Sequence, residues 1–258
     1  MEWFIAEQAI FCLCGATVPF YDTLGPDSAR FILRQTETKT VVCSREQLDR
    51  LCQVKTSGEC PTLETAVLVD GVTPEAAIMA KDAKLKIVSF AKVEAIGAQR
   101  IATKGHQHRP PSGKDVFTFC YTSGTTGDPK GAMLTHENIM SAISGSDNIL
   151  PVRIGDRHLS YLPLAHIFER FVMSQVYVHG ASIAFSRGDP LLLIEDIQAC
   201  SPTVLIAAPR VLNKIYDKAS SPTPAFLKSV LFIPDFFFVM YVWPNNLDSR
   251  RYGCSWRV

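Results

Sequence analysis

The amino-acid sequence predicts an α/β fold with mostly parallel sheets and flanking helices. Apolar runs rich in β-branched residues alternate with segments of helical periodicity, a pattern typical of strand–helix–strand units. The chain has 258 residues, 47% of them hydrophobic, which is enough to build a substantial core. We expect seven strands, enough for a doubly wound core, at residues 40–43, 66–70, 86–90, 116–121, 158–162, 182–185 and 203–207.

Two helices are expected before the first strand. Residues 1–20 place acidic residues within an apolar stretch and have no basic segment at the start, which favours an amphipathic helix over a signal peptide. The next helix is expected to begin at Pro26 or Asp27, because a fixed φ and an acidic side chain both suit a first turn.

Later helices show their own start signals and faces. Ser44 and Gln47 have the spacing of a capping box, in which each of the two side chains accepts a hydrogen bond from the backbone N–H of the other residue. Further along, Phe168, Val172 and Val176 recur every four residues and should form one face of a helix packed on a sheet.

Charge and hydropathy exclude several classes of protein. With 26 basic and 25 acidic residues the net charge is +1, so no global field attracts nucleic acid, and nucleic-acid binding is not expected. The strongly apolar stretch 230–243 is shorter than the roughly 20 residues that span a bilayer, and it contains Pro234 and Asp235. We therefore predict no transmembrane helix, while peripheral membrane association stays open.

The cysteine and histidine residues give little indication of a metal or redox site. The eight cysteines have no paired CxxC spacing, which favours reduced core thiols in a reducing compartment over a zinc site. Cys12 and Cys14 form one close pair, and His106 and His108 another. We interpret the first pair as structural and the second as part of a solvated loop over residues 97–114, and we predict no metal-binding residues.

The stretch "FTFCYTSGTTGDPKGAMLTHENI", residues 117–139, concentrates glycine and hydroxyl residues between an apolar run and a helical run. It matches neither GxxxxGK[ST] nor GxGxxG, the two familiar phosphate motifs. The simplest interpretation is a flexible connection from a strand directly into a helix.

The chemistry of this stretch favours an anion site instead. Its hydroxyl side chains can donate to anionic oxygens, and its glycines let backbone N–H groups turn toward a ligand. Lys130 adds a positive charge, Pro129 stiffens the exit, and Thr135 is placed to cap the next helix. The predicted ATP- and phosphate-binding residues are Thr122, Ser123, Gly124, Thr125, Thr126, Gly127 and Lys130.

Residues 121–136, "YTSGTTGDPKGAMLTH", resemble the phosphate-binding signature of the adenylate-forming enzymes. This superfamily contains acyl-CoA synthetases, firefly luciferase and peptide-synthetase adenylation domains. The segment "YLPLAHIFER" at 161–170 and the long stretch 179–218 resemble the eukaryotic long-chain fatty acyl-CoA synthetases, as do two segments near the start. The resemblance covers about residues 2–220.

The resemblance implies a fold, a reaction and its cofactors. The fold would be part of an N-terminal adenylation domain. A long-chain fatty acid would react with ATP to form an acyl-adenylate and pyrophosphate, and the thiol of CoA would then displace AMP. Such a reaction requires ATP, Mg²⁺ and CoA.

The same resemblance assigns further site residues. His166 matches a position beside the substrate carboxylate, with the alternative that it only caps a helix. Glu169 and Arg170 belong to the same signature, which in the family lines the acyl pocket and its entry. As neighbours on a helix they are not expected to pair with each other, and a structural role is favoured over a place in the substrate pocket. Arg210 could orient the nucleotide or buttress the loop, and a structural ion pair is the alternative.

The chain also departs from the family pattern. Residues 1–225 are expected to form a partial AMP-binding domain and 226–258 a divergent aromatic tail, without the C-terminal domain that bears the adenylation lysine. Turnover by this chain alone is therefore expected to be impaired. A catalytically inactive module that binds a nucleotide or a partner stays an alternative, as does a different acyl- or aryl-CoA ligase. The resemblance implies the cytosolic face of the endoplasmic reticulum, mitochondrial outer membrane or peroxisome, or the cytoplasm for a chain without an anchor.

Overall fold

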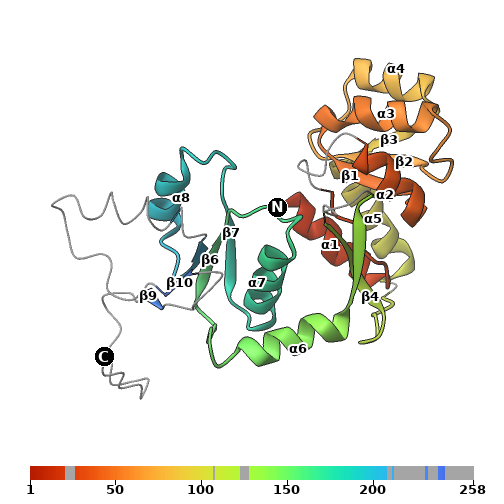
Figure 1. Cartoon of the computed structure of the whole chain (residues 1–258). Coiled ribbons are helices and arrows are strands. Elements are labelled where there is room, and N and C mark those ends of the chain that lie inside the picture. The colour runs from red at the N-terminus through yellow and green to blue at the C-terminus, as the bar shows by residue number, and fades with distance from the viewer. Residues whose placement is uncertain are drawn as a thin grey trace, which may run out of the picture. The chain divides into compact units, whose positions relative to one another are not determined.

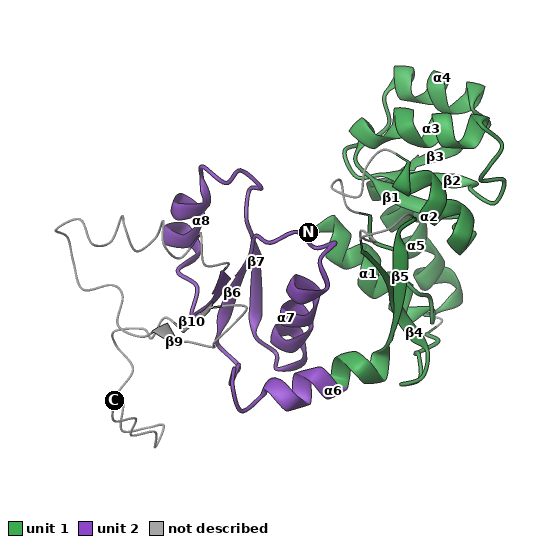
Figure 2. Cartoon of the chain, in the orientation of Figure 1, with its two compact units in different colours: residues 1–140 green, residues 141–258 purple. Residues whose placement is uncertain are grey.

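The computed structural model of the chain describes residues 1–20, 27–106, 108–122, 128–207, 211, 230–231 and 238–241 (Figure 1). The chain divides into two compact units, residues 1–140 and 141–258 (Figure 2). Helix α6 (His136–Ser146) runs across the boundary between the two units. The predicted mixture of helices and parallel sheets is confirmed.

The first unit contains a three-stranded parallel sheet with its helices. Strands β1 (Thr40–Cys43), β2 (Thr65–Leu68) and β3 (Lys86–Ser89) lie in the order β1-β2-β3. Leu33, Leu51, Leu68 and Ala76 share one buried apolar cluster, which joins β2 to the surrounding helices. These helices are α2 (Ser28–Thr36), α3 (Leu48–Thr56) and α4 (Pro74–Asp82).

Both expected N-terminal helices form, but the first is not amphipathic as predicted. In α1 (Glu2–Cys12), Glu7 and Phe11 are the buried residues, whereas the apolar Ile5 is 38% exposed. The prediction was wrong because an acidic side chain of this helix faces inward. The second helix, α2, begins at Ser28, one residue later than the predicted start at Asp27, which is its N-cap and makes no side-chain capping bond; Pro26 lies outside the described residues.

The predicted capping box at Ser44 and Gln47 does not form. The Ser44 side chain makes no capping bond, and a short 3-10 helix, η2 (Arg45–Gln47), precedes α3. The carboxylate of Asp70 instead accepts the N–H of Arg45, at 2.8 and 3.1 Å. The Asp70 side chain, which follows β2, thus provides an acceptor for an N–H at the start of η2, and a capping bond from Ser44 is not needed.

The expected loop over residues 97–114 begins later than predicted. Helix α5 (Phe90–Lys104) continues to Lys104, since no residue before Gly105 breaks it, and Gly105 ends it with a φ of 73°. His106 and His108 lie exposed in the shorter loop, with ring centroids 5.8 Å apart. Beyond the loop, β4 (Val116–Thr122) and β5 (Lys130–Thr135) form a two-stranded antiparallel sheet.

The second unit contains a mixed five-stranded sheet in the order β7-β6-β8-β10-β9. Strand β6 pairs in parallel with β7 and β8, and β10 is antiparallel to β8 and β9. The strands are β6 (Arg157–Ser160), β7 (Ser182–Phe185), β8 (Val204–Ala207), β9 (Val230–Leu231) and β10 (Phe238–Tyr241). All seven predicted strands are present within two residues of their predicted ends, but they belong to three sheets and not to one doubly wound core.

Helices α7 (Ile167–Val178) and α8 (Leu193–Cys200) cover opposite faces of this sheet (Figure 1). Val204 and Ile206 of β8 pack with α7, through the predicted face of Phe168, Val172 and Val176. Leu205, between them on the same strand, packs with α8. Alternate residues of a strand point to opposite faces, so the two helices lie on different sides.

Two further findings concern membranes and thiols. Among the described residues, no helix combines the length and the apolar character that a bilayer crossing requires. The seven described cysteines are all free thiols, and Cys254 lies outside the described residues.

Candidate functional site

The glycine-rich stretch connects two strands of a hairpin. Thr122 and Lys130 are the register pair next to the connection, and both are exposed. The expected direct step from strand to helix is wrong, because residues 130–135 pair with β4 before the helix begins. Five predicted phosphate-binding residues lie outside the described residues: Ser123, Gly124, Thr125, Thr126 and Gly127.

A close approach of an aromatic ring to a glycine fixes the hairpin beside this register pair. Tyr121 and Gly131 lie opposite each other, and a Cβ on Gly131 would lie 2.9 Å from Cζ of Tyr121. The ring is 3% exposed, and its hydroxyl donates to Oε1 of Gln35 at 2.6 Å. Burial raises the pKa of Tyr121, so the phenol stays a neutral donor.

The N-terminal segment holds the other edge of β4. Thr17 forms an isolated parallel bridge with Thr118, and the N–H of Phe119 donates to the Thr17 carbonyl at 2.9 Å. The hydroxyl of Thr118 donates to the same carbonyl at 3.0 Å. Beneath them the rings of Phe11 and Phe117 stack with centroids 4.4 Å apart. Strand β4 is thus held on both sides.

Helix α6 begins with the predicted cap. The N–H of Asn138 donates to Oγ1 of Thr135 at 3.2 Å, and the N–H of Thr135 donates to Oδ1 of Asn138 at 3.0 Å. His136 follows, with its ring edge-on to Phe11 and Phe117. Burial lowers the pKa of His136, and the nearby Asp115 carboxylate opposes that shift.

Cys14, one of the two cysteines in the CxC pair, contacts a carboxylate. Its thiol donates to Oδ2 of Asp115 at 3.4 Å, and this bond is the main cause that raises the pKa of Cys14. The same carboxylate oxygen accepts the N–H of Ser112 at 2.6 Å. No group of three or more His, Cys, Asp or Glu residues that could hold a metal ion occurs within the described part of the chain.

In the second unit, His166 follows β6, the middle of the three parallel strands, and is the N-cap of α7. Its Nδ1 accepts the N–H of Phe168 at 3.2 Å, so the capping contact weighed from the sequence is present. The connection from β6 passes over one face through α7, and that from β7 passes over the other through α8. Ligands of open α/β sheets bind at the carboxyl ends of such adjacent strands. His166 therefore lies at a favourable position for a substrate.

Glu169 and Arg170 are both buried in the first turn of α7, 0% and 1% exposed. Glu169 Oε1 lies 3.2 Å from Nε2 of His158, a residue that sequence reasoning missed. The Nδ1 of His158 lies 3.3 Å from the carbonyl oxygen of Val204. The sequence signal that could have pointed to His158 is a histidine within a predicted apolar strand. Arg210 lies outside the described residues.

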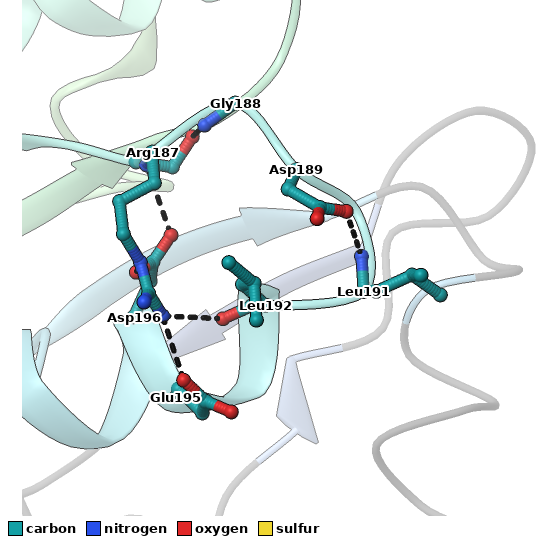
Figure 3. Close-up of polar contacts among 8 residues, drawn as sticks. Arg187, Gly188, Asp189, Leu191, Leu192, Glu195 and Asp196 are labelled. Carbon is teal, nitrogen blue, oxygen red and sulfur yellow. Dashed lines mark hydrogen bonds and ion pairs between the residues drawn. The ribbon is translucent and has the colours of Figure 1, made fainter.

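The loop between β7 and α8 is fixed by Arg187 (Figure 3). The guanidinium donates to Asp196 at 2.6 Å, to Glu195 at 2.9 Å and to the carbonyl of Leu192 at 3.4 Å. The backbone N–H of Arg187 also donates to Asp196, and this bond is the main cause that lowers the pKa of Asp196. The loop follows the carboxyl end of β7, at the same edge of the sheet as His166.

Comparison with protein families and curated proteins gives a consistent result. The profile of the family described as "AMP-binding enzyme" matches residues 1–235. Long-chain-fatty-acid–CoA ligase 6 of Homo sapiens is 38% identical over 235 residues, covering 88% of this chain and 33% of the relative. Long chain acyl-CoA synthetase 6, peroxisomal, of Arabidopsis thaliana is 35% identical, covering 83% and 30%. The chain thus spans about a third of the length of these relatives.

Solved structures give the same fold. The adenylation domain of a carboxylate reductase from Mycobacterium chelonae has a TM-score of 0.69 at 20% identity, covering 84% of this chain and 36% of that domain. ATP-bound MatB from Rhodopseudomonas palustris has a TM-score of 0.56 at 21% identity, covering 79% and 36%. The predicted adenylation-domain fold is therefore confirmed.

Proposed function

This chain belongs to the AMP-binding enzyme family, and from that membership we propose that it serves the activation of long-chain fatty acids to acyl-CoA. The observation that carries the proposal is its similarity to proteins named long-chain-fatty-acid–CoA ligase. Identity is 34–38% over 84–91% of this chain for relatives from four mammals.

The proposed reaction has two steps. The fatty carboxylate attacks the α-phosphorus of ATP, forming a mixed anhydride and releasing pyrophosphate. The thiolate of CoA then attacks the acyl carbon, and AMP leaves with the former carboxylate oxygen. A carboxylate is repelled by phosphate, so the protein has to neutralise charge and hold the reactants in line.

Thr122 and Lys130 are the described residues that we assign to the triphosphate, together with residues 123–127 between them. A hydroxyl donor and an ammonium group stand on opposite strands at the end of the hairpin where the two strands are connected, and both are exposed. They suit the β- and γ-phosphates. The triphosphate would bring Mg²⁺ with it, because phosphate oxygens are ligands that this ion prefers.

We assign His166 to the fatty carboxylate. It follows β6, the middle of the three parallel strands, and caps the helix that covers this side of the sheet through the bond from the N–H of Phe168 to its Nδ1. Glu169 and Arg170 would support this turn and not touch the substrate, since both are buried. Arg210 is proposed to orient the nucleotide.

The proposal can be tested with the purified chain and radioactive pyrophosphate. Palmitate-dependent exchange of pyrophosphate into ATP, larger than that with benzoate, supports a fatty substrate; the reverse order supports an aryl-CoA ligase. Lys130→Ala should weaken ATP binding roughly tenfold or more, since one charge-assisted contact to phosphate is lost. Lys104→Ala, an exposed lysine at the end of α5, is the matched control.

Two other outcomes separate the remaining alternatives. ATP binding that depends on Lys130 without exchange would favour a nucleotide-binding module. No measurable binding of ATP would contradict the proposal. As to location, two similar proteins of Arabidopsis thaliana are named as peroxisomal. We propose the cytosolic side of an organelle membrane, and cell fractionation tests it.

A further inference from the structure

A histidine and a glutamate meet in the interior of the second unit. His158 lies on strand β6 and Glu169 in the first turn of α7, and both are 0% exposed. Nε2 of His158 is 3.2 Å from Oε1 of Glu169, and Nδ1 is 3.3 Å from the carbonyl oxygen of Val204 on β8. The imidazole thus bridges a neighbouring strand and the start of a helix.

The partners of the ring determine how many protons the pair holds. The carbonyl of Val204 can only accept, so Nδ1 of His158 must carry a proton. A second proton then lies between Nε2 and Oε1, either on the imidazole or on the carboxyl group of Glu169. The pair has no net charge in either form, which suits complete burial. Without this proton, two lone pairs would face each other.

The contact fixes the turn that contains His166. Glu169 is three residues after His166, and the N–H of Arg170 donates to the His166 carbonyl within the same turn. On the other side, the N–H of His166 donates to the carbonyl of Pro163 at 2.9 Å. The side chain of Glu169 joins this turn directly to strand β6. A shift of that bond would move the His166 imidazole.

We propose that His158 is a positioning residue, which orients the imidazole of His166 through one proton shared with Glu169. The consequence for fatty-acid activation rests on the proposed function, whereas the orientation of His166 does not. A purely structural pair would contribute to folding and leave the His166 ring unaffected. The two interpretations therefore differ in what happens at His166 in a variant that still folds.

The test is imidazole ¹⁵N NMR of the full 258-residue chain with labelled histidine. Signals of His158 and His166 are assigned with His158→Gln and His166→Asn. We expect the wild-type His158 to be protonated at Nδ1, and Glu169→Gln to shift both ring nitrogens of His166. A wild-type His158 without a proton on Nδ1 would overturn the proposal.

Asp147→Asn is the matched control for Glu169→Gln. Asp147 Oδ1 contacts Nε2 of His179 at 3.3 Å, a similar pair at the opposite end of the same helix α7. It is partly exposed, so the substitution should keep the fold. The proposal requires the His166 signals to stay unchanged in this control. Equal shifts in both variants would mean that α7 responds as a whole, and would overturn it.

A double variant separates orientation from folding if single variants are too unstable. His158→Leu with Glu169→Leu replaces the pair by apolar groups, a change that buried pairs often tolerate. We expect this chain to fold with His166 still displaced from its wild-type signals. If the folded double variant reproduces those signals, the pair is structural and the proposal fails.

If the chain catalyses palmitate-dependent pyrophosphate exchange, this activity provides a second measurement. Glu169→Gln should lower palmitate-dependent exchange roughly tenfold or more, because a small misplacement of a positioned group is costly, while ATP affinity stays as in the wild type. The NMR result needs no turnover. A failure of the proposed function, seen as absent exchange in the wild type, is thus distinct from a failure of this proposal.

Discussion

The ring of Tyr121 lies across Gly131 on the neighbouring strand, so closely that a side chain at residue 131 would have no room. Cζ of Tyr121 is 2.9 Å and Cε1 3.0 Å from the position of a Cβ on Gly131. The ring cannot easily turn away, since it is buried and its hydroxyl is bound to Gln35. This contact sits one register pair from Thr122 and Lys130 and stiffens the base of the candidate phosphate loop.

Gly131→Ala should therefore destabilise the chain by about 1–3 kcal/mol, the usual cost of overpacking a close contact. Equilibrium unfolding in urea measures the change. Gly145→Ala is the control: that glycine lies in α6, and nothing lies within 4 Å of the place that a Cβ would take. Alanine there should be neutral or add up to about 1 kcal/mol through helix propensity. Equal losses in both variants would contradict the steric account.

The cap of α6 gives a second prediction. Thr135→Ala should cost about 1 kcal/mol, because the N–H of Asn138 loses the hydroxyl that accepts its bond. Thr103→Ala is a suitable control, since that exposed hydroxyl bonds back to carbonyls inside α5 and caps nothing. Urea unfolding followed by circular dichroism checks both. A threonine-to-serine change at residue 135 should keep most of the stability.

Much of the fold could be predicted because periodicity and β-branched runs are local signals. The seven predicted strands reflect apolar runs that end at turn residues. The strand 130–135 was missed since Gly131 and its exposed neighbours carry no alternating pattern, and it forms through pairing with β4. The division into three sheets depends on long-range pairing, which local sequence does not encode.

The candidate site shows the same limit. The cap at Thr135 and the helical face at Val172 follow from spacing, and both were predicted. The contact of His158 with Glu169 joins residues eleven positions apart on different elements, and a histidine within an apolar strand gives no indication of its partner. Likewise Asp70 replaces the expected Ser44 cap, although it lies 25 residues along the chain from the N–H that it accepts.

A third prediction concerns pH and His136. Burial lowers the folded-state pKa of His136 below its unfolded value of 6.5, so the unfolded chain binds more protons between the two values. This contribution to stability is fully present above pH 6.5 and is lost as pH falls through the lower, folded-state value. Urea unfolding at a series of pH values, roughly from 7.5 down to 5, should show the loss.

Two histidine variants are compared in this experiment, one at the partly buried His136 and one at the exposed His106. His136→Asn should flatten the decline, because no group at that position then gains a proton on unfolding. His106→Asn changes an exposed histidine and should leave the slope as in the wild type. A slope that is unaltered by His136→Asn would show that another group causes it.

Two exposed arginines provide the last prediction, since they differ in geometry. Arg187 joins Asp196, Glu195 and a backbone carbonyl at the start of α8 (Figure 3), whereas Arg30 has single contacts of 3.5 Å to Glu59 and 3.8 Å to Asp27. Isolated surface ion pairs contribute little, but a fork that satisfies several acceptors at once fixes its loop. Arg187→Ala should therefore speed hydrogen exchange at the Gly188 and Leu191 amides several-fold and lower the melting temperature.

Arg30→Ala should change neither the exchange of its neighbours nor the melting temperature measurably. Arg187→Lys separates charge from geometry: a lysine keeps the positive charge but cannot reach Asp196, Glu195 and the Leu192 carbonyl together. We expect it to behave like the alanine variant in hydrogen exchange. If lysine restores wild-type protection of the loop, charge alone is sufficient, and the planar fork of the guanidinium is not what holds the β7–α8 connection in place.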